Sequence, residues 1–238
     1  MSSPPPQGHP VRLPQAHLPT SKTLQGRTIA LKKLTSTHAK DLFPLIGGLA
    51  EPTQSLWTYM FDGPYETIDP FQTSITSKSA SADPFFYAVI DKRANTPTSG
   101  KAIGYLSLMR ITPEHLCIEI GNVMFSPALQ RTTGATEAIY LLADYVFAEL
   151  GYRRLEWKCD SLNVPSRKAA GRLGFEFEGV FRQHMVVKGR NRDTAWYSVL
   201  REEWEGGLKR AMERWLDVGN FGEDGRQILG LRELRGEN

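Results

Sequence analysis

The sequence predicts a mixed α/β fold (an α+β arrangement with one mixed sheet) in which helices flank a central sheet. Between Cys117 and Gly174 it reads strand, polar loop, amphipathic helix, strand and capped helix, an order typical of two parallel strands joined by a crossover helix. Residues 85–110 and 175–200 each read as a β-hairpin around a Gly-containing turn. Antiparallel hairpins on both sides of a parallel pair predict a mixed sheet.

The composition fits a soluble globular chain and argues against several functional classes. The 238 residues are 40% apolar and 23% charged with a formal net charge of +3, which suits one sizeable domain with extensions and does not indicate a nucleic-acid binder. Cys117 and Cys159 lie inside apolar strands, which argues against a disulfide framework and a zinc site. No apolar run approaches the roughly 18 residues of a membrane span. We therefore expect a cytoplasmic monomer or homodimer without metal, nucleic acid or membrane as a partner.

The amino-terminal part divides into a tail, a strand and short helices. Residues 1–25 are rich in Pro, Ser and Gln and lack periodicity, so we expect a flexible tail. Residues 27–34 (RTIALKKL) read as the first strand, and residues 35–37 offer a cap for the helix that follows. Residues 67–79 predict another helix.

An aromatic segment precedes that helix and contains Trp57, Tyr59 and Tyr65. Packing over the sheet is the simpler interpretation for any one of them. Alternatively they line a substrate pocket, because ligand pockets commonly combine aromatic walls with few polar groups. Trp57, Tyr59 and Tyr65 are therefore the candidate substrate-binding residues.

An acid, Glu119, interrupts the otherwise apolar strand 116–125. Regular alternation predicts two faces, one with Leu116, Ile118, Ile120, Asn122 and Met124 and the other with Cys117, Glu119, Gly121, Val123 and Phe125. A buried carboxylate is costly unless it is paired, and burial raises its pKa toward the range useful to a general base. The alternative is a structural carboxylate held by an arginine.

A polar loop and a long amphipathic helix follow this strand, and we expect the helix to continue to about Leu150 and to close at Gly151. A helix N-terminus presents free N–H groups and a partial positive charge, which favour a phosphate. The loop adds a guanidinium, threonine hydroxyls and small residues that let a ligand approach the backbone. The candidate ligand-binding residues are Gln130, Arg131, Thr132, Thr133, Gly134, Ala135 and Thr136.

The next strand, RRLEWKCD, leads into a second capped helix. Asn163 suits the N-cap position, with Pro165 and Ser166 in the first turn and Gly174 at the end. Such a cap is often purely structural, so a chemical role for Ser166 is a hypothesis. After the last hairpin, residues 202–215 predict a terminal helix.

Together these residues resemble the GNAT acetyltransferase superfamily, in particular its RimJ/RimL-like branch of N-terminal-amine acetyltransferases. The resemblance covers roughly residues 27–204. It rests on IEIGNVMF, QRTTGATEA, the N-x-x-S and Gly-Phe of the capped helix, GFEFEGVFRQ, and KGRNRDTAWYSVL followed by Glu-Trp. It divides the chain into a flexible tail (1–25), an acetyltransferase domain (26–205) and a C-terminal helix with a polar tail (206–238).

The resemblance implies a bent mixed sheet that splays between its fourth and fifth strands, with the cosubstrate acetyl-CoA in the opening. Pantetheine would pair with the strand at Val123, Met124 and Phe125, and pyrophosphate would lie on residues 130–136. Asn163 would hold the pantetheine arm or order a water. Ser166 would protonate or hydrogen-bond the leaving thiolate. Glu119 would deprotonate the acceptor ammonium, directly or through water. The implied catalytic residues are Glu119, Ser166 and Asn163, the last two also touching the cosubstrate.

Two positions depart from the family's pattern. Thr133 occupies the first Gly position of Q/R-x-x-G-x-G/A when Gln130 and Ala135 are aligned, which puts a side chain close to the phosphates. Ala170 stands where many members carry a tyrosine acid, four residues before the Gly-Phe. The general acid of the implied reaction would then be Ser166, or there would be none.

The implied reaction is direct transfer of acetyl to the primary amine of an amino acid, a peptide N-terminus or a small molecule. An acyl-cysteine route is disfavoured because both cysteines lie on predicted strands that contain no histidine. Two other classes stay open. One is a CoA-binding protein with vestigial catalysis and a partner at the aromatic region 52–75. The other is a nucleic-acid module using Arg153, Arg154, Lys158, Arg190 and Arg192, although such scattered basic residues are more often a solvated surface.

Overall fold

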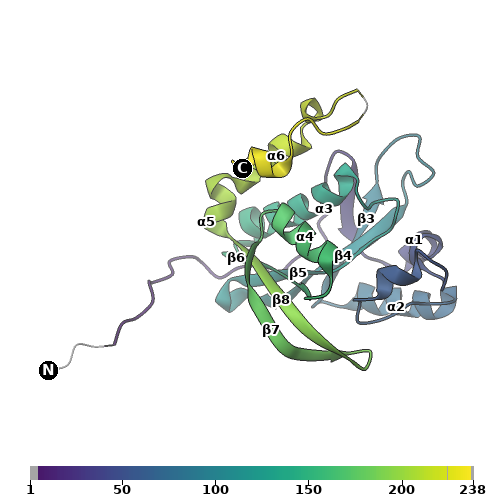
Figure 1. Ribbon diagram of the computed structural model, residues 1–238, viewed down its shortest axis with the longest axis horizontal. Coiled ribbons are helices and arrows are strands. Elements are labelled where there is room, and N and C mark those ends of the chain that lie inside the picture. Colours follow the sequence, from purple (N-terminus) through teal and green to yellow (C-terminus); the bar gives the residue numbers. More distant parts are fainter. Residues whose placement is uncertain (1–4, 224, 237–238) are drawn as a thin grey trace.

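The computed structural model describes residues 5–223 and 225–236 and shows an eight-stranded mixed sheet with helices on both faces (Figure 1). The strand order is β1-β2-β3-β4-β5-β6-β8-β7. The strands are β1 (Leu24–Gln25), β2 (Ile29–Lys33), β3 (Phe85–Asp91), β4 (Ala102–Thr112), β5 (Cys117–Phe125), β6 (Arg154–Asp160), β7 (Glu176–Val187) and β8 (Arg190–Leu200).

The helices are α1 (Ala39–Ile46), α2 (Ile68–Ala80), α3 (Thr133–Asp144), α4 (Val164–Arg172), α5 (Arg201–Glu203), α6 (Lys209–Leu216) and α7 (Leu231–Leu234). Two π-helical segments adjoin these helices: Tyr145–Leu150 follows α3, and Trp204–Leu208 lies between α5 and α6. Short 3₁₀ turns lie at Ser36–His38, Gln54–Trp57, Pro113–His115 and Val218–Asn220. The predicted helix at 67–79 is confirmed as α2 within a residue, and Gly151 closes the α3 segment in the left-handed conformation, with a φ of 85°. The single helix predicted at 202–215 was wrong in one respect, because the non-helical backbone of Gly207 divides this segment between α5 and α6.

Two apolar clusters cover the two faces of the sheet. One cluster packs α3, α4 and α6 against strand residues such as Ile118, Ile120 and Leu155. The other packs α1, α2 and Trp57 against residues of β3 and β4 and against Met124. The sheet is therefore the middle layer of three.

The sheet opens between β5 and β6, its parallel pair. Their partners run from Cys117↔Arg154 to Ile120↔Trp157 and end there. Each strand nevertheless continues along its outer neighbour, β5 with β4 as far as Phe125 and β6 with β8 as far as Asp160. Since β2 is the first of the sequence-predicted strands, β5 and β6 are the fourth and fifth, and the splay is confirmed.

A bulge in β5 changes the predicted faces of that strand. Tyr105 of β4 lies opposite Met124 and Ser107 opposite Gly121, so one residue of β4 faces both Asn122 and Val123. Asn122 has a φ of 50°, which Asn tolerates, and its side-chain amide donates to Ser107 Oγ at 3.0 Å.

The alternation of faces shifts at this extra residue. Val123 and Phe125 pack on the α3 side with Ile118, and Met124 packs on the α1–α2 side. The assignment of Met124 to the face of Ile118 was wrong, because the bulge inserts a residue that the regular period does not anticipate.

Part of the predicted tail packs on the domain. Residues 5–15 are exposed and extend away from the body (Figure 1). From Ala16 on it is anchored: His17 N donates to Leu150 O at 2.8 Å, Thr20 N donates to Tyr145 Oη at 3.1 Å, and Leu24 begins β1. No described helix is both long and apolar enough to cross a membrane.

A buried carboxylate fixes α3 to the start of β2. Glu137 accepts hydrogen bonds from the backbone N–H groups of Arg27 (2.5 Å), Thr28 (2.8 Å) and Ile29 (3.1 Å), and from Thr28 Oγ1 (2.6 Å). A buried charge is tolerated when hydrogen bonds satisfy it in this way. The beginning of α3, and the loop before it, are therefore held against the sheet edge.

Candidate active site

A cleft of about 1300 Å³ occupies the opening between β5 and β6. The cleft is lined from both faces of the sheet. One wall is formed by β5, the loop 130–136 and the start of α4, and the other by the segment 55–61 with Lys158 and Arg192. The cleft therefore opens toward both faces of the sheet at the splay.

The loop that precedes α3 lines one end of this cleft with all of residues 130–136. Thr132 is the N-cap residue of α3, and Arg131 has a φ of 59°. Two of the loop side chains already bond within the protein, Gln130 Nε2 to Phe125 O at 2.8 Å and Thr132 Oγ1 to Leu129 O at 2.6 Å. A Cβ on Gly134 would come within 2.8 Å of Ile29 Cγ2, so this glycine is required by packing on β2.

Positive charge gathers at the same end. Arg131, Arg93, Arg172 and Arg226 line the cleft there. Arg93 is paired with Asp91 at 2.7 Å, and Arg172 donates to Thr136 Oγ1 at 3.0 Å. A helix N-terminus with guanidinium groups around it is suited to an anion.

The free edge of β5 forms the middle of the cleft. Val123 and Phe125 line it with their side chains, whereas the Met124 side chain is buried in the α1–α2 cluster. Among the described residues, β5 has no partner on the β6 side beyond Ile120, so its backbone is open there to an extended ligand.

Asn163 and Ser166 meet at the start of α4, as predicted. Asn163 Oδ1 accepts from Ser166 N at 3.1 Å, which makes Asn163 a true N-cap. Ser166 Oγ accepts from Trp157 Nε1 at 3.0 Å, and the Ser166 hydroxyl also hydrogen-bonds the Cys159 side chain. Both residues line the cleft.

Glu119 lies at the other end of the cleft and is only 4% exposed. Its Oε2 is 3.0 Å from Lys158 Nζ and 3.4 Å from Arg110 Nε. Burial raises the pKa of Glu119, and the two cations oppose that rise. Despite these charges, Oε2 receives no hydrogen bond of good geometry from the described residues.

Lys158 holds Glu119 within a larger network. Its ammonium group, 4% exposed, also pairs with Glu156 at 2.6 Å and lies 3.8 Å from the centre of the Trp196 ring. Glu156 in turn pairs with Arg154 at 2.7 Å. The carboxylate of Glu119 is thus oriented by a cation that is itself fixed on three sides.

The aromatic segment covers this end of the cleft, but only one of the three predicted residues lines it. Tyr59 reaches across the opening and donates from Oη to Leu162 O at 3.2 Å. Trp57 is 1% exposed, donates to Ile46 O at 2.7 Å and belongs to the α1–α2 core. Tyr65 packs edge-on against Trp57 and donates to Asp62 at 2.8 Å.

For Trp57 and Tyr65 the packing interpretation therefore applies, because both rings fill the space between α1 and α2. Phe61, which the sequence analysis did not select, lines the cleft beside Tyr59.

Comparison with known proteins decides the family. Residues 28–176, more than half of the chain, match the model of the acetyltransferase (GNAT) domain. This chain is a GNAT acetyltransferase.

Solved GNAT structures support this assignment along most of the chain. A GCN5-related N-acetyltransferase from Brucella melitensis is 45% identical, with a TM-score of 0.88 over 93% of this chain and 97% of that one. A probable GNAT acetyltransferase from Chromobacterium violaceum is 40% identical, with a TM-score of 0.74 over 86% of this chain and 100% of that one. The RimJ/RimL-like fold is therefore shown.

Curated relatives match over shorter segments. The putative ribosomal N-acetyltransferase YdaF of Bacillus subtilis (strain 168) is 32% identical over 107 residues, which are 45% of this chain and 58% of that relative. Across five such relatives the chain spans 40% to 59% of their length.

Membership of the GNAT family implies acetyl-CoA as the acetyl donor, and the residues present fit it. The loop at the N-terminus of α3, with arginines from other segments around it, suits the phosphates, and the unpaired edge of β5 suits the amide groups of an extended arm. Asn163 and Ser166 lie beyond that edge, near where the thioester would end. The described residues contain no cluster of three or more metal-binding side chains.

The GNAT cleft also contains residues that the sequence analysis missed or misplaced. Arg110, Lys158 and Arg192 surround Glu119, although the sequence suggested a solvated surface for Lys158 and Arg192. The signal was present in RRLEWKCD: Leu155, Trp157 and Cys159 share one face, so Glu156 and Lys158 share the other.

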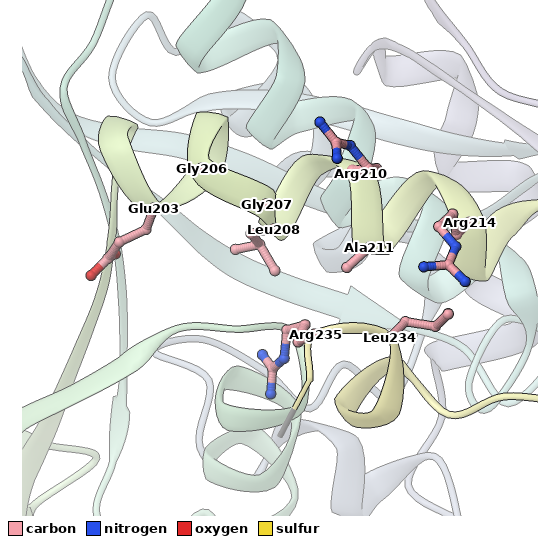
Figure 2. A pocket seen from close by; sticks show the side chains of 9 residues that line it. All are labelled: Glu203, Gly206, Gly207, Leu208, Arg210, Ala211, Arg214, Leu234 and Arg235. Carbon is pink, nitrogen blue, oxygen red and sulfur yellow. The ribbon is translucent and has the colours of Figure 1, made fainter. Parts of the chain in front are cut away.

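A second, smaller hollow of about 510 Å³ lies between α6 and α7, away from the GNAT cleft. Figure 2 shows Leu208 and Ala211 of the α6 side facing Leu234 and Arg235 across it. Its acid, Glu203, accepts a hydrogen bond from Leu200 N at 2.7 Å and so serves the start of α5. This hollow offers no residue set for acetyl transfer.

Proposed function

We propose that this GNAT acetyltransferase moves acetyl from acetyl-CoA directly to a primary amine in a ternary complex, with Glu119 as general base. The observation that carries the proposal is the continuity of the cleft through the splayed sheet. The phosphate loop opens into it on the α3 side and Glu119 opens into it on the α1–α2 side, so donor and acceptor can meet at the gap. Holding two reactants together in this way supplies a large part of a transfer rate.

Glu119 would take one proton from the acceptor ammonium, directly or through a water. The nitrogen lone pair freed in this way forms the new bond to the acetyl carbon, and the carbon–sulfur bond breaks with its electron pair going to sulfur. The bonded nitrogen then gives up its surplus proton. Ser166 would hydrogen-bond the sulfur, or would give the sulfur its own proton while taking up the one released from nitrogen, so that the amide and the free thiol result. The proposal is supported by Glu119, which lines the cleft and whose buried Oε2 atom lies near two cations without receiving a hydrogen bond of good geometry from the described residues.

A covalent cysteine route has little support. Burial raises the pKa of Cys117 to about 11 and raises that of Cys159 as well, which leaves both thiols protonated at neutral pH. Cys117 is also absent from the cleft lining.

The ion pair with Lys158 favours a second interpretation, in which Glu119 is a structural carboxylate and the cleft binds acetyl-CoA without efficient catalysis. The two interpretations predict different consequences of neutralising Glu119. A structural carboxylate leaves Lys158 paired with Glu156 and affects stability, whereas a base affects the pH dependence of turnover.

The test is thiol release from acetyl-CoA with a panel of amino acids, peptide N-termini and small amines, comparing the parent with Glu119→Gln. Similarity to YdaF places ribosomal-protein N-terminal peptides in that panel. Loss of a general base is expected to lower kcat/KM by about 10²- to 10⁴-fold and to flatten the acid limb of its pH profile. Glu202→Gln, an exposed acid on α5, is the matched control.

An unchanged pH profile in Glu119→Gln, with acetyl-CoA still bound in calorimetry, would remove Glu119 from the role of base. Acetyl-CoA binding without thiol release for any amine in the panel would favour the binding-protein interpretation.

A further inference from the structure

Arg192 is a buried cation in the wall of the acceptor end of the cleft. It is 7% exposed, its Nε donates to Thr194 Oγ1 at 3.2 Å, and its guanidinium lies 5.0 Å from the centre of the Phe61 ring. Among residues 5–223 and 225–236, no carboxylate forms an ion pair with it. Burial lowers the pKa of Arg192, and the charges of Asp160 and Glu119 oppose that effect from outside ion-pair distance.

The other cations near Arg192 have ion-paired carboxylates. Lys158 is paired with Glu119 and Glu156, and Arg110 reaches Glu119 at 3.4 Å. Asp160 accepts from Leu162 N at 2.9 Å and acts on Arg192 through its charge without forming an ion pair with it. Arg192 is therefore the cation of this end that has no ion-paired carboxylate among the described residues.

The phosphates of the donor would be held on the other side of the sheet from Arg192. They belong to the α3 side, where the loop 130–136 meets Arg93, Arg131 and Arg172. Arg192 instead contacts Phe61, which comes from the segment that covers the α1–α2 side. On β8 it also shares a strand face with Thr194 and Trp196, whereas Ala195 and Tyr197 pack on the α3 side. An anion at Arg192 would therefore come from the acceptor.

Resting on the proposed acetyl transfer, we propose that the acceptor is a small primary amine that carries a carboxylate, with Arg192 binding the carboxylate while Glu119 receives the ammonium proton. A guanidinium fork matches a planar carboxylate, and a bidentate pair fixes orientation as well as affinity. The Phe61 ring lies 5.0 Å from the guanidinium, and Tyr59 lines the cleft with it. Arg192 is a specificity-determining residue in this arrangement, and Lys158 and Arg110 stay with Glu119.

The experiment compares acceptors that differ only in the carboxylate. Each standard α-amino acid is tested beside its α-amide, with β-alanine and 4-aminobutyrate as longer spacings, by thiol release from acetyl-CoA. The parent is expected to prefer the acid of its best pair by about 10-fold or more in kcat/KM, because an unpaired buried guanidinium remains when the amide binds. Aminomethylphosphonate is included to separate a carboxylate from a phosphonate.

Substitutions of Arg192 test whether this residue causes the preference for the carboxylate. Arg192→Gln is expected to raise KM for the acid by about 10- to 100-fold and to leave the amide nearly unchanged. Arg192→Lys keeps the charge and restores part of the acid's affinity. Arg190→Gln, an exposed arginine at the start of β8, is the matched control and is expected to change neither acceptor. Calorimetric titration with acetyl-CoA reports on the fold of each variant.

Each outcome decides between the two proposals. Amides as good as acids in the parent, or an equal loss of both in Arg192→Gln, would overturn the carboxylate inference and leave the acetyl-transfer proposal standing. A preference for the phosphonate would overturn it in the same way. No thiol release with any amine, despite bound acetyl-CoA, would remove the proposed function and the inference with it. Should Arg192→Gln fail to fold, the acid–amide comparison in the parent and Arg192→Lys decides.

Discussion

The carboxylate of Glu137 offers the sharpest test of how the phosphate loop is positioned. Its two oxygens satisfy three backbone N–H groups and one hydroxyl at 2.5–3.1 Å, and the residue is buried. Hydrogen bonds to a charged acceptor contribute about 1.5–3 kcal/mol each, but bonds to one carboxylate are not additive. Removing one member of a buried charged network typically costs about 3–5 kcal/mol.

We therefore expect Glu137→Ala to lower the free energy of unfolding by about 4 kcal/mol. For a chain of this size each 1 kcal/mol shifts Tm by about 2–4 °C, so Tm falls by about 8–16 °C. Glu137→Gln should lower the free energy of unfolding by less. An amide oxygen in place of Oε2 still accepts from Thr28 and Ile29, and only Arg27 N faces the NH₂ group. The two variants thus form a graded series.

The assay is urea denaturation followed by tryptophan fluorescence, together with calorimetric titration of acetyl-CoA. Because Glu137 anchors α3 to β2, the affinity for acetyl-CoA should fall along with stability. Glu149→Ala is the control: Glu149 is exposed and pairs with the exposed Lys22, so the loss should stay below about 1 kcal/mol. A loss of less than about 1 kcal/mol in Glu137→Ala would refute the anchoring role.

Three further outcomes follow from the cleft. Lys158→Met removes a cation that lowers the pKa of Glu119, so that pKa rises further and the acid limb of the pH–kcat/KM profile moves to higher pH; a profile that stays in place would contradict the pairing. Asn163→Ala removes the cap of α4 and should cost about 0.5–2 kcal/mol of stability in thermal denaturation, with Asn163→Asp retaining most of it. Ser166→Ala should lower kcat by about 10-fold or less, because a thiolate leaves readily; a loss comparable to that of Glu119→Gln would make Ser166 an obligatory acid.

The sequence was most informative where local chemistry decides the structure. Asn163 with Pro165 predicted the start of α4, and Gly151 predicted the end of the α3 segment, because caps depend on neighbouring residues alone. The polar loop before α3 could be predicted for the same reason. The splay of the sheet between β5 and β6 was predicted from the resemblance to the GNAT superfamily and not from the periodicity of the sequence.

Features that depend on distant neighbours were harder to predict. Trp57 is an aromatic residue in a segment that could equally line a pocket. Its place in the core is shown by its hydrogen bond to the Ile46 carbonyl, which the sequence does not reveal. The buried positions of Lys158 and Arg192 depend on which strands lie beside β6 and β8 and on Phe61 folding over them. The buried role of Glu137 could not be predicted from its neighbours, since its four donors come from a segment more than a hundred positions earlier in the chain.

The extra residue in β5 has a consequence for tracing the ancestry of this protein. A relative that lacks the residue equivalent to Asn122 cannot keep both Ile120 and Met124 in their present layers. A one-position gap at this point in an alignment would therefore mark a change in which side chains build each layer. Residues on either side of such a gap should be compared by the layer they enter and not by their order along the strand.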